Sequence, residues 1–414
     1  MQANDITEGA TAEGRGRVVL QVLPRLETGG VERGTVDVAA AAAARGDTSL
    51  VASAGGPLTY QVERAGAEHI TLPLHRKDPW SLWRNAARLE ALILERGVEI
   101  VHVRSRAPAW SAWLAARRTG ARFLTTFHGT YNFRSGLKRR YNAVMTKGDL
   151  VIAISHFIAR HMQENYDIDP ARVRVVPRGT DLALFDPSRI HPDRLAKLAQ
   201  RWRLPDGVPM IMLPGRLTRW KGQALLVEAL MRLRERDFVC VLVGSDQGRS
   251  GYREELEKLI GDLGLGRKVI LGGDCNDIAA AYMLCDVVVS ASTDPEAFGR
   301  VASEAQAMGR PLVAADHGGV PEQVLDGETA CLVRPGDAAD LARGLTWALD
   351  LDTQARERLA RTARAQARKF TREGMCASTL AVYDELAALG AQVRTPEQMS
   401  RIDTAGAQRS LTEL

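Results

Sequence analysis

Short apolar runs and longer amphipathic stretches alternate along almost the whole chain, which predicts parallel β-sheets covered by helices on both faces. The apolar runs are rich in Val, Ile and Leu, as is typical of strands buried on both sides. In the first half we expect strands at Arg17–Leu23, Ser49–Ala52, Ile100–Val103, Phe123–Thr126, Leu150–Ile154 and Val173–Val176. In the second half we expect them at Met210–Leu213, Val239–Val243, Val269–Leu271, Val287–Val289, Leu312–Ala314 and Cys331–Val333.

The strand pattern restarts after a segment with proline at both ends, and 414 residues exceed one ordinary core. We therefore predict two doubly wound domains in series, with ligands where the carboxyl ends of strands face a crevice. After Asp337 the pattern is entirely helical, and its last helix, Arg372–Leu389, could cross back to the first domain. The predicted organisation is a disordered leader (1–16), a first domain (17–185), a linker (186–207), a second domain (208–370), a returning helix (371–390) and a tail (391–414).

Composition narrows the class of protein. Apolar content of 45% and charged content of 25% are those of a globular protein. The apolar stretches are too short to span a bilayer and no signal-peptide pattern opens the chain. The five cysteines show neither CxxC pairing nor a nearby histidine cluster, so we expect reduced thiols, no metal site and a cytoplasmic location.

A net charge of +5 hides one strongly basic segment. Residues 101–150 hold ten Lys and Arg against the single acid Asp149, a balance of +9. A solvated helix surface is the plain explanation. The alternative is an anionic partner, and Lys138-Arg139-Arg140-Tyr141, close to Trp110 and Trp113, suits a membrane interface where aromatic and cationic groups anchor together. Nucleic acid is disfavoured because no recognised DNA- or RNA-binding module accompanies the segment.

The stretch from Asp294 to Glu304 carries the sharpest chemical signal. Glu296 is predicted in a strand-to-helix loop and Glu304 inside the helix that follows. The N–H groups around Phe298 to Val301 would be unpaired donors at the helix start, which suits a phosphate. The two carboxylates could bind the two ends of a nucleotide sugar. The plain alternative is a helix with an acidic first turn and one exposed Glu.

Cations follow the first strand of the second half. Arg216 at the strand end and Lys221 at the next helix start could converge on a diphosphate and neutralise a leaving pyrophosphate without a metal. Two surface cations in a loop are the alternative.

Taken together, these motifs resemble the family-4 retaining glycosyltransferases of the GT-B fold, over about residues 17–390. The residues that carry the resemblance are Gly29-Gly30, Gly215-Arg216-Leu217, Lys221-Gly222, Glu296-Ala-Phe-Gly-Arg-Val, Glu304, Gly318-Gly319-Val-Pro-Glu322 and Asp326-Gly327-Glu-Thr. The leading half looks most like bacterial lipopolysaccharide core mannosyl- or glucosyltransferases. The resemblance implies an α/β fold of two Rossmann-like, doubly wound parallel-sheet domains facing a central cleft, with a C-terminal helix that crosses back to the first domain.

The resemblance also implies roles for single residues. Gly30 lets the backbone approach the donor, Arg216 and Lys221 bind the diphosphate, and Glu296 holds hydroxyls of the transferred sugar. Phe298, Gly299 and Arg300 would donate backbone N–H groups to the distal phosphate, and Glu304 would accept from the ribose hydroxyls. His128 would lie near the reacting sugar and Asp274 near the base. For His128 the plain alternative is a structural histidine. For the segment of Asp274 the alternative is that Asp277 caps the next helix.

The expected reaction is transfer of a hexose, preferably mannose from GDP-mannose, with no cofactor and no metal. No Asp-x-Asp stands at the end of a convincing central strand, and the first domain offers no well-placed carboxylate base or nucleophile. Cations and helix N-termini would then stabilise the diphosphate, and front-face substitution with retention is favoured.

Several interpretations stay open. The preferred one is a peripheral enzyme on the inner face of the cytoplasmic membrane that acts on a lipid-linked saccharide, a lipopolysaccharide inner core. The second uses a soluble phosphorylated or small-alcohol acceptor, and the third is a non-catalytic nucleotide-sugar-binding scaffold. A dehydrogenase is poorly supported because Thr28-Gly29-Gly30 lacks the G-x-G-x-x-G fingerprint.

Overall fold

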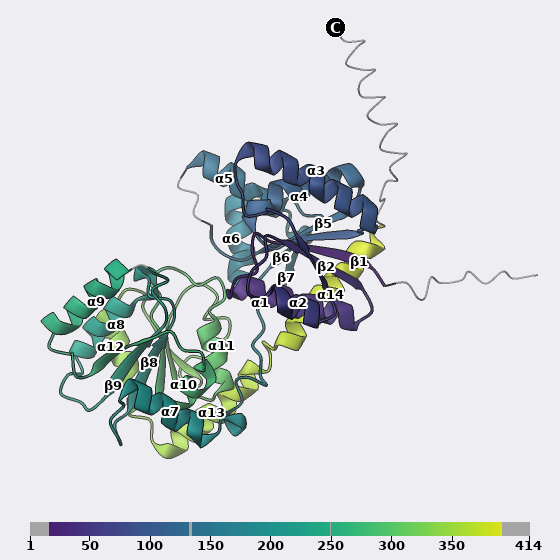
Figure 1. Cartoon of the computed structure of the whole chain (residues 1–414). Helices are drawn as coiled ribbons and strands as arrows, with labels where there is room; N and C mark the ends of the chain where they lie inside the picture. The colour runs from purple at the N-terminus through teal and green to yellow at the C-terminus, as the bar shows by residue number, and fades with distance from the viewer. Residues whose placement is uncertain (1–15, 132–134, 249, 391–414) are drawn as a thin grey trace, which may run out of the picture. The chain divides into compact units, whose positions relative to one another are not determined.

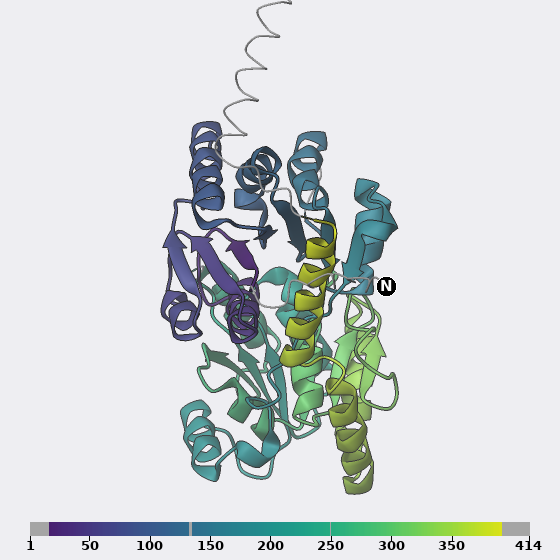
Figure 2. The same ribbon diagram turned by 90° about the vertical axis from the view of Figure 1, so that its right-hand side faces the viewer.

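The computed structural model describes residues 16–131, 135–248 and 250–390, so the predicted leader and tail lie almost wholly outside the described residues. Contacts divide the chain into two compact units (Figure 1). The first gathers the described residues within 1–127, 133–152 and 379–414, and the second those within 128–132 and 153–378. Each unit contains a parallel sheet with helices on both faces (Figures 1 and 2), as the sequence predicts, although the last strand of the first sheet, at Val173–Val175, falls within the range of the second unit.

The first sheet has seven strands in the order β3-β2-β1-β4-β5-β6-β7. The strands are β1 Val18–Val22, β2 Thr48–Ser53, β3 Glu68–Thr71, β4 Ile100–Val103, β5 Arg122–Phe127, β6 Leu150–Ala153 and β7 Val173–Val175. The helices among them are α1 Gly30–Ala44, α2 Thr59–Arg64, α3 Pro79–Arg96, α4 Arg106–Thr119, α5 Gly136–Asn142 and α6 His156–Tyr166. The order reverses between β1 and β4, and the loop that follows β1 leads into α1.

The second sheet has six strands in the order β10-β9-β8-β11-β12-β13. They are β8 Met210–Pro214, β9 Val239–Val243, β10 Val269–Gly273, β11 Val287–Ser290, β12 Leu312–Ala315 and β13 Ala330–Val333. The helices are α7 Pro192–Trp202, α8 Gln223–Met231, α9 Ser250–Asp262, α10 Ile278–Leu284, α11 Arg300–Ala307, α12 Ala338–Leu349, α13 Thr353–Ala367 and α14 Arg372–Ala388.

Alternate side chains of the second sheet feed two separate hydrophobic cores, because successive residues of a strand point to opposite faces. Met210 and Met212 pack in one core, which α7, α10 and α11 complete. Ile211 and Leu213 pack in the other, with α8, α9 and α12. A strand that buries both faces must be apolar throughout, which is why these strands read as continuous apolar runs.

The segment 186–207, expected as a linker, folds onto this sheet. The side chains of Leu198 and Trp202 on α7 are 6% and 4% exposed and belong to the first of the two cores. The indole N–H of Trp202 donates to the carbonyl of Gly272 over 3.1 Å. Helix α14 contributes its residues from Thr379 onward to the first unit, where the fully buried Tyr383 pairs with Nδ1 of His102 at 2.8 Å.

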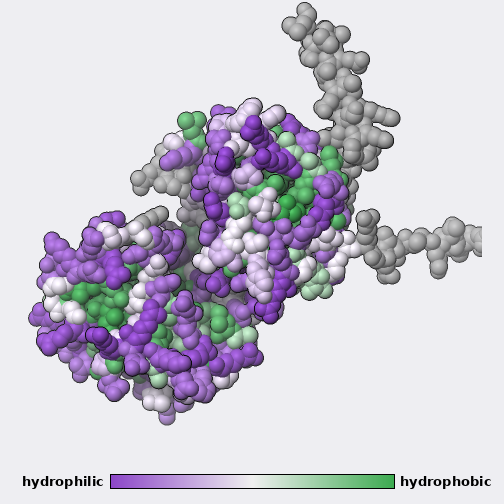
Figure 3. Space-filling view, in the orientation of Figure 1, coloured by the Kyte–Doolittle hydropathy of each residue, from purple (hydrophilic) through white to green (hydrophobic). Residues whose placement is uncertain are grey.

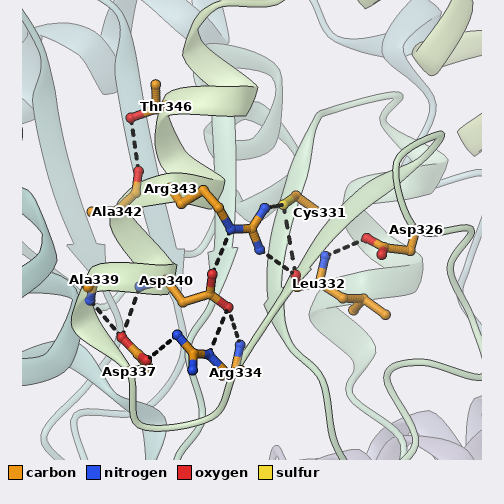
Figure 4. A network of polar contacts seen from close by, with 10 residues as sticks. All are labelled: Asp326, Cys331, Leu332, Arg334, Asp337, Ala339, Asp340, Ala342, Arg343 and Thr346. Atoms are coloured by element: carbon orange, nitrogen blue, oxygen red, sulfur yellow. Dashed lines mark hydrogen bonds and ion pairs between the residues drawn. The ribbon is translucent and has the colours of Figure 1, made fainter.

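The edge strand β13 is closed by side chains rather than by another strand (Figure 4). Oδ1 of Asp326 accepts from the N–H of Leu332 at 2.8 Å, and Nη2 of Arg343 donates to the Leu332 carbonyl at 3.2 Å. Nε of Arg343 is in turn held by Asp340 at 2.6 Å. Both backbone groups of Leu332 on the outer edge of the strand are thus satisfied, which blocks pairing with a further strand there.

None of the helices within the described residues combines the length and apolar character that crossing a bilayer requires. On the face drawn in Figure 3, hydrophilic residues predominate and hydrophobic residues gather in separate patches.

Candidate active site

The loops that carry the predicted residues Arg216, Lys221 and Glu296 lie where the strand order of the second sheet reverses. Strand β11 pairs with β8, although β9 and β10 lie between them in the sequence. Ligands of doubly wound sheets bind outside the carboxyl ends of the strands at such a point. Here the loop after β8 carries Arg216 and Lys221, and the loop after β11 carries Glu296.

Lys221 and Glu296 meet directly. Nζ of Lys221 forms an ion pair with Oε1 of Glu296, and Oγ of Ser292 donates to the same oxygen at 2.7 Å. The two charged side chains are only 16% and 13% exposed. Oε2 of Glu296 makes no hydrogen bond with the described residues, so it can accept from a ligand hydroxyl.

A glycine brings the two loops together. Gly222, directly after Lys221, has φ +75, and a Cβ there would lie 1.9 Å from the carbonyl oxygen of Ala291. No other residue type fits such a contact in this conformation. The close approach of the loops after β8 and β11 therefore depends on this glycine, and it sets the distance between the lysine and the carboxylate.

The loop that carries Glu296 is held from the other side by the turn after β12. The N–H of Gly319 donates to the Glu296 carbonyl at 2.8 Å, and the buried amide of Gln323 donates to the carbonyls of Phe298 and, at 3.1 Å, Gly319. Gly318 has φ +70 and lies so close that a Cβ would be 2.3 Å from the Glu296 oxygen. The position of Glu296 is thus fixed by backbone contacts.

The start of α11 presents free donors. Gly299 occupies the N-cap position with φ +87, and no side chain caps the helix. Among the described residues, no acceptor binds the backbone N–H groups of Phe298, Gly299, Arg300 and Val301. Four unpaired donors at the positive end of a helix dipole form a site for an anion such as a phosphate.

Glu304 is 8% exposed and is held by two donors. The hydroxyl of Tyr282 on α10 donates to Oε2 at 2.9 Å, and Arg300 pairs with Oε1 at 3.2 Å. Burial, and then the Glu304 carboxylate, raise the pKa of Tyr282 well above its usual value, so the phenol stays protonated and keeps donating. Sequence reasoning missed Tyr282, whose only signal is a large aromatic within an alanine-rich helix.

Arg216 lies in the loop after β8, the same loop that carries Lys221. Its exposed side chain makes no ion pair or hydrogen bond with the residues that the structure describes. With Leu217, Trp220 and Tyr252 it lines a cavity of about 600 Å³. The lining includes neither Glu296 nor Glu304, so the cavity is a neighbour of the carboxylate site rather than the site itself.

Asp274 lies farther along the sheet edge. It follows β10, three strands away from β11, which at the usual spacing is about 14 Å. Asp274 is exposed, so it stays available to a ligand group at that end. Asp277 caps α10 through the N–H of Ala280, which is the plain alternative that the sequence offers. The structure adds an ion pair between Asp277 and Arg194 at 2.6 Å, which the sequence does not predict.

Two predicted residues come from other parts of the chain. Gly30 is the first residue of α1, directly after the N-cap Gly29. His128 directly follows β5, and its N–H donates to the Tyr131 hydroxyl at 3.3 Å. Their roles toward a donor stay predictions. No group of three or more His, Cys, Asp and Glu side chains suited to a metal occurs within the described ranges.

Comparisons with known proteins agree with this geometry. Residues 196–366 match the family model of group 1 glycosyl transferases, and residues 28–184 match that of Glycosyltransferase Family 4. The chain is 34% identical over 319 residues to a D-inositol 3-phosphate glycosyltransferase of Xylanimonas cellulosilytica, covering 72% of this chain and 74% of the relative.

Two solved structures are similar as well. The crystal structure of a glycosyltransferase from Rickettsia africae matches with a TM-score of 0.84 at 38% identity and covers 90% of this chain and 99% of that one. The Anabaena HepE structure in complex with UDP-glucose matches with a TM-score of 0.76 at 25% identity and covers 88% and 99%. The chain therefore belongs to the group 1 and family 4 glycosyltransferases, enzymes with the GT-B fold.

Proposed function

We propose that this enzyme transfers a hexose from a nucleoside-diphosphate sugar to a phosphorylated acceptor, with retention of anomeric configuration and without a metal ion. The observation that carries the proposal is the Lys221–Glu296 pair, held beside the open N–H groups of α11 at the switch point of the second sheet. The Lys221 cation and the anion site at the start of α11 suit a diphosphate, and the free oxygen of the Glu296 carboxylate suits a hydroxyl of the sugar bonded to it.

Each group has a role in this proposal. The N–H groups from Phe298 to Val301 bind the distal phosphate, and Arg216 and Lys221 neutralise the charge that develops on the diphosphate. Glu296 accepts from hydroxyls of the transferred sugar. Glu304, oriented by Tyr282, accepts from the ribose.

The proposed chemical step is a front-face substitution. The bond from the anomeric carbon to the diphosphate oxygen breaks and the diphosphate leaves with the electron pair. The acceptor oxygen bonds to the same face, and its proton passes to the departing phosphate oxygen. The fixed donors stabilise the departing charge without reorganising.

The comparisons favour particular substrates. The names of the curated relatives favour the second interpretation of the sequence, a soluble phosphorylated acceptor, over a lipopolysaccharide core. HepE was solved with UDP-glucose, which favours a uridine donor over the GDP-mannose expected from the sequence. A membrane-associated saccharide stays a second candidate, since Lys138, Arg139 and Arg140 of the basic segment are exposed.

The test is a donor and acceptor screen. Thermal unfolding of the purified chain is followed with UDP-, GDP- and ADP-sugars, and the matched donor should raise the midpoint. Transfer from that donor is then measured with inositol phosphate and with a lipid-linked saccharide, and the anomeric configuration of the product is determined by NMR. An inverted product, loss of transfer on chelation of divalent metal, or no stabilisation by any nucleotide sugar would contradict the proposal.

A further inference from the structure

Large apolar side chains are exposed on two helices of the first unit, α3 and α5. Seven such side chains are exposed among the described residues, and three of them lie on α3 and α5. Trp80 and Trp83 on α3 are 61% and 55% exposed, and Leu137 on α5 is 81% exposed. The two indole rings stack on each other with centroids 5.5 Å apart, so they present one continuous apolar surface.

Exposed cations lie in the same stretch of sequence as this tryptophan pair. The guanidinium of Arg84 lies 5.0 Å from the ring centre of Trp80. Arg76, Lys77 and Arg88 are exposed in the same stretch. The only acid between residues 75 and 88 is Asp78, whose carboxylate caps α3 by accepting from the N–H of Ser81. We call Trp80, Trp83 and these four cations the α3 cluster.

Helix α5 repeats the combination. Leu137 is followed by Lys138, Arg139 and Arg140, all exposed, and the helix contains no acid. We call these four residues the α5 cluster.

Hydrogen bonds place the two clusters around one turn of α4. Oγ of Ser111 donates to the carbonyl of Leu82 on α3 at 2.8 Å, and Nε1 of Trp110 donates to the carbonyl of Tyr141 on α5 at 3.1 Å. Figure 1 shows α3, α4 and α5 on the same side of the first sheet. Since packed helices lie about 8–10 Å apart, the clusters are separated by roughly 20 Å.

We propose that the α3 and α5 clusters together form a docking surface for an anionic phospholipid bilayer. Indole rings favour the boundary between headgroups and acyl chains, and neighbouring cations are attracted to anionic headgroups. A protein partner is less suited, because the cores of protein interfaces are depleted of charge, whereas the two clusters together combine seven exposed cations with three exposed apolar side chains. In this proposal the basic segment 101–150 binds the membrane together with an apolar anchor, Trp80 and Trp83, that lies outside the segment. It does not depend on the proposed function, because binding is measured without donor or acceptor.

The test is flotation of the purified full chain with vesicles of phosphatidylcholine, with and without phosphatidylglycerol. The wild type should float only with anionic vesicles, and less so as salt rises. The double variant Trp80→Ser/Trp83→Ser should weaken partitioning about tenfold or more, because both interfacial anchors are lost. Reversing Lys138, Arg139 and Arg140 to Glu should weaken it at least as much and remove the salt dependence.

Matched controls separate this surface from general effects. Tyr60→Ser on α2 removes another exposed aromatic of the same unit, 65% exposed, and should float as the wild type does. Reversal of Arg358, Arg361 and Arg364 on α13 makes the same change in net charge and should have a much smaller effect. The proposal is overturned if the wild type does not float, if the control variants lose as much as the test variants, or if the tryptophan variant changes only the oligomeric state in size-exclusion chromatography.

Discussion

The buried hydroxyl of Tyr282 donates a hydrogen bond to Oε2 of Glu304 over 2.9 Å, and this bond joins helices α10 and α11. The ring of Tyr282 is fixed by an edge-to-face contact with Phe185 at 5.7 Å. Arg300 holds the other carboxylate oxygen. Glu304 is therefore oriented before any ligand arrives, which reduces the entropy cost of binding.

Removing that hydroxyl should weaken donor binding selectively. In Tyr282→Phe the ring keeps its packing, but one oxygen of Glu304 loses its donor. We expect the KM for the donor to rise about tenfold, with kcat nearly unchanged, and unfolding to cost about 1–2 kcal/mol less. Steady-state kinetics and denaturant unfolding measure the two effects.

Tyr383→Phe is the matched control, because it removes the hydroxyl of another fully buried tyrosine, one bonded to His102. This variant should lose stability and keep the donor KM. An unchanged donor KM in Tyr282→Phe would mean that Glu304 does not bind the donor or needs no orientation by Tyr282.

The turn glycine Gly318 should be more important for activity than for folding. Its backbone, at φ +70, packs so closely on Glu296 that an added Cβ would lie 2.3 Å from the oxygen and 2.7 Å from the nitrogen of that residue. In Gly318→Ala the loop must move and take the carboxylate with it. Displacement by about 1 Å can reduce turnover about a hundredfold, so we expect kcat/KM to fall by that order.

Gly327→Ala provides the comparison. Gly327 has φ +77, but a Cβ there would have no neighbour within 4 Å. Both variants carry the same left-handed backbone strain of about 1–2 kcal/mol, and only Gly318→Ala pushes on Glu296. Similar losses of kcat/KM in the two variants would show that strain, not displacement of Glu296, is responsible.

The sequence identified twelve of the thirteen strands found in the described part of the chain, because strands buried on both faces must be apolar runs. The strand it missed is β3, Glu68–Thr71, which lies at the edge of the first sheet and is partly exposed. Only Ile70 in it is aliphatic, so no apolar run marks it. Edge strands need less apolar surface and are correspondingly harder to recognise.

The charged residues of the site could be found from spacing, and their supports could not. Glu296 and Glu304 stand in one short motif, whereas Ser292, Gln323 and Tyr282 contact that motif only once the strands are ordered. Likewise, the pairing of Lys221 with Glu296 depends on β8 and β11 being neighbours. Sheet order is a long-range property that local periodicity does not contain.

Lys221 and Glu296 should both be needed for transfer. Lys221→Ala removes a cation that neutralises the diphosphate, and Glu296→Ala removes the sugar contact, so either should abolish measurable transfer while the protein stays folded. Each single variant also leaves a partly buried charge without its partner, which costs stability. The loss of unfolding free energy in the double variant should therefore be smaller than the sum of the losses in the two single variants. The double variant should be as inactive as either single variant.

Calorimetry and initial-rate assays of the three variants test this. Arg236→Ala, which breaks the exposed ion pair with Asp350, controls for loss of a salt bridge and should change neither property appreciably. If Lys221→Ala and Glu296→Ala keep near-normal rates, the site assignment is wrong.

Stability should fall below neutral pH through His102. Burial, and then the nearby Arg104, lower the pKa of His102 well below 6.5. In the unfolded chain the same imidazole has its ordinary pKa, so below about pH 6.5 the unfolded state binds a proton that the folded state does not. The contribution is present above that pH and is lost as pH falls, by about 1.4 kcal/mol per pH unit for this one group.

The measurement is the free energy of unfolding between about pH 6 and pH 5, where most carboxylates stay ionised. His102→Gln should be less stable at all pH values, because the imidazole bonds Tyr383 and Thr126, but its slope with pH should be smaller by about 1.4 kcal/mol per unit. His69 and His161, whose pKa values burial also lowers, contribute to the slope in the variant and the wild type alike. If the variant and the wild type have equal slopes, His102 is not the group that titrates on unfolding.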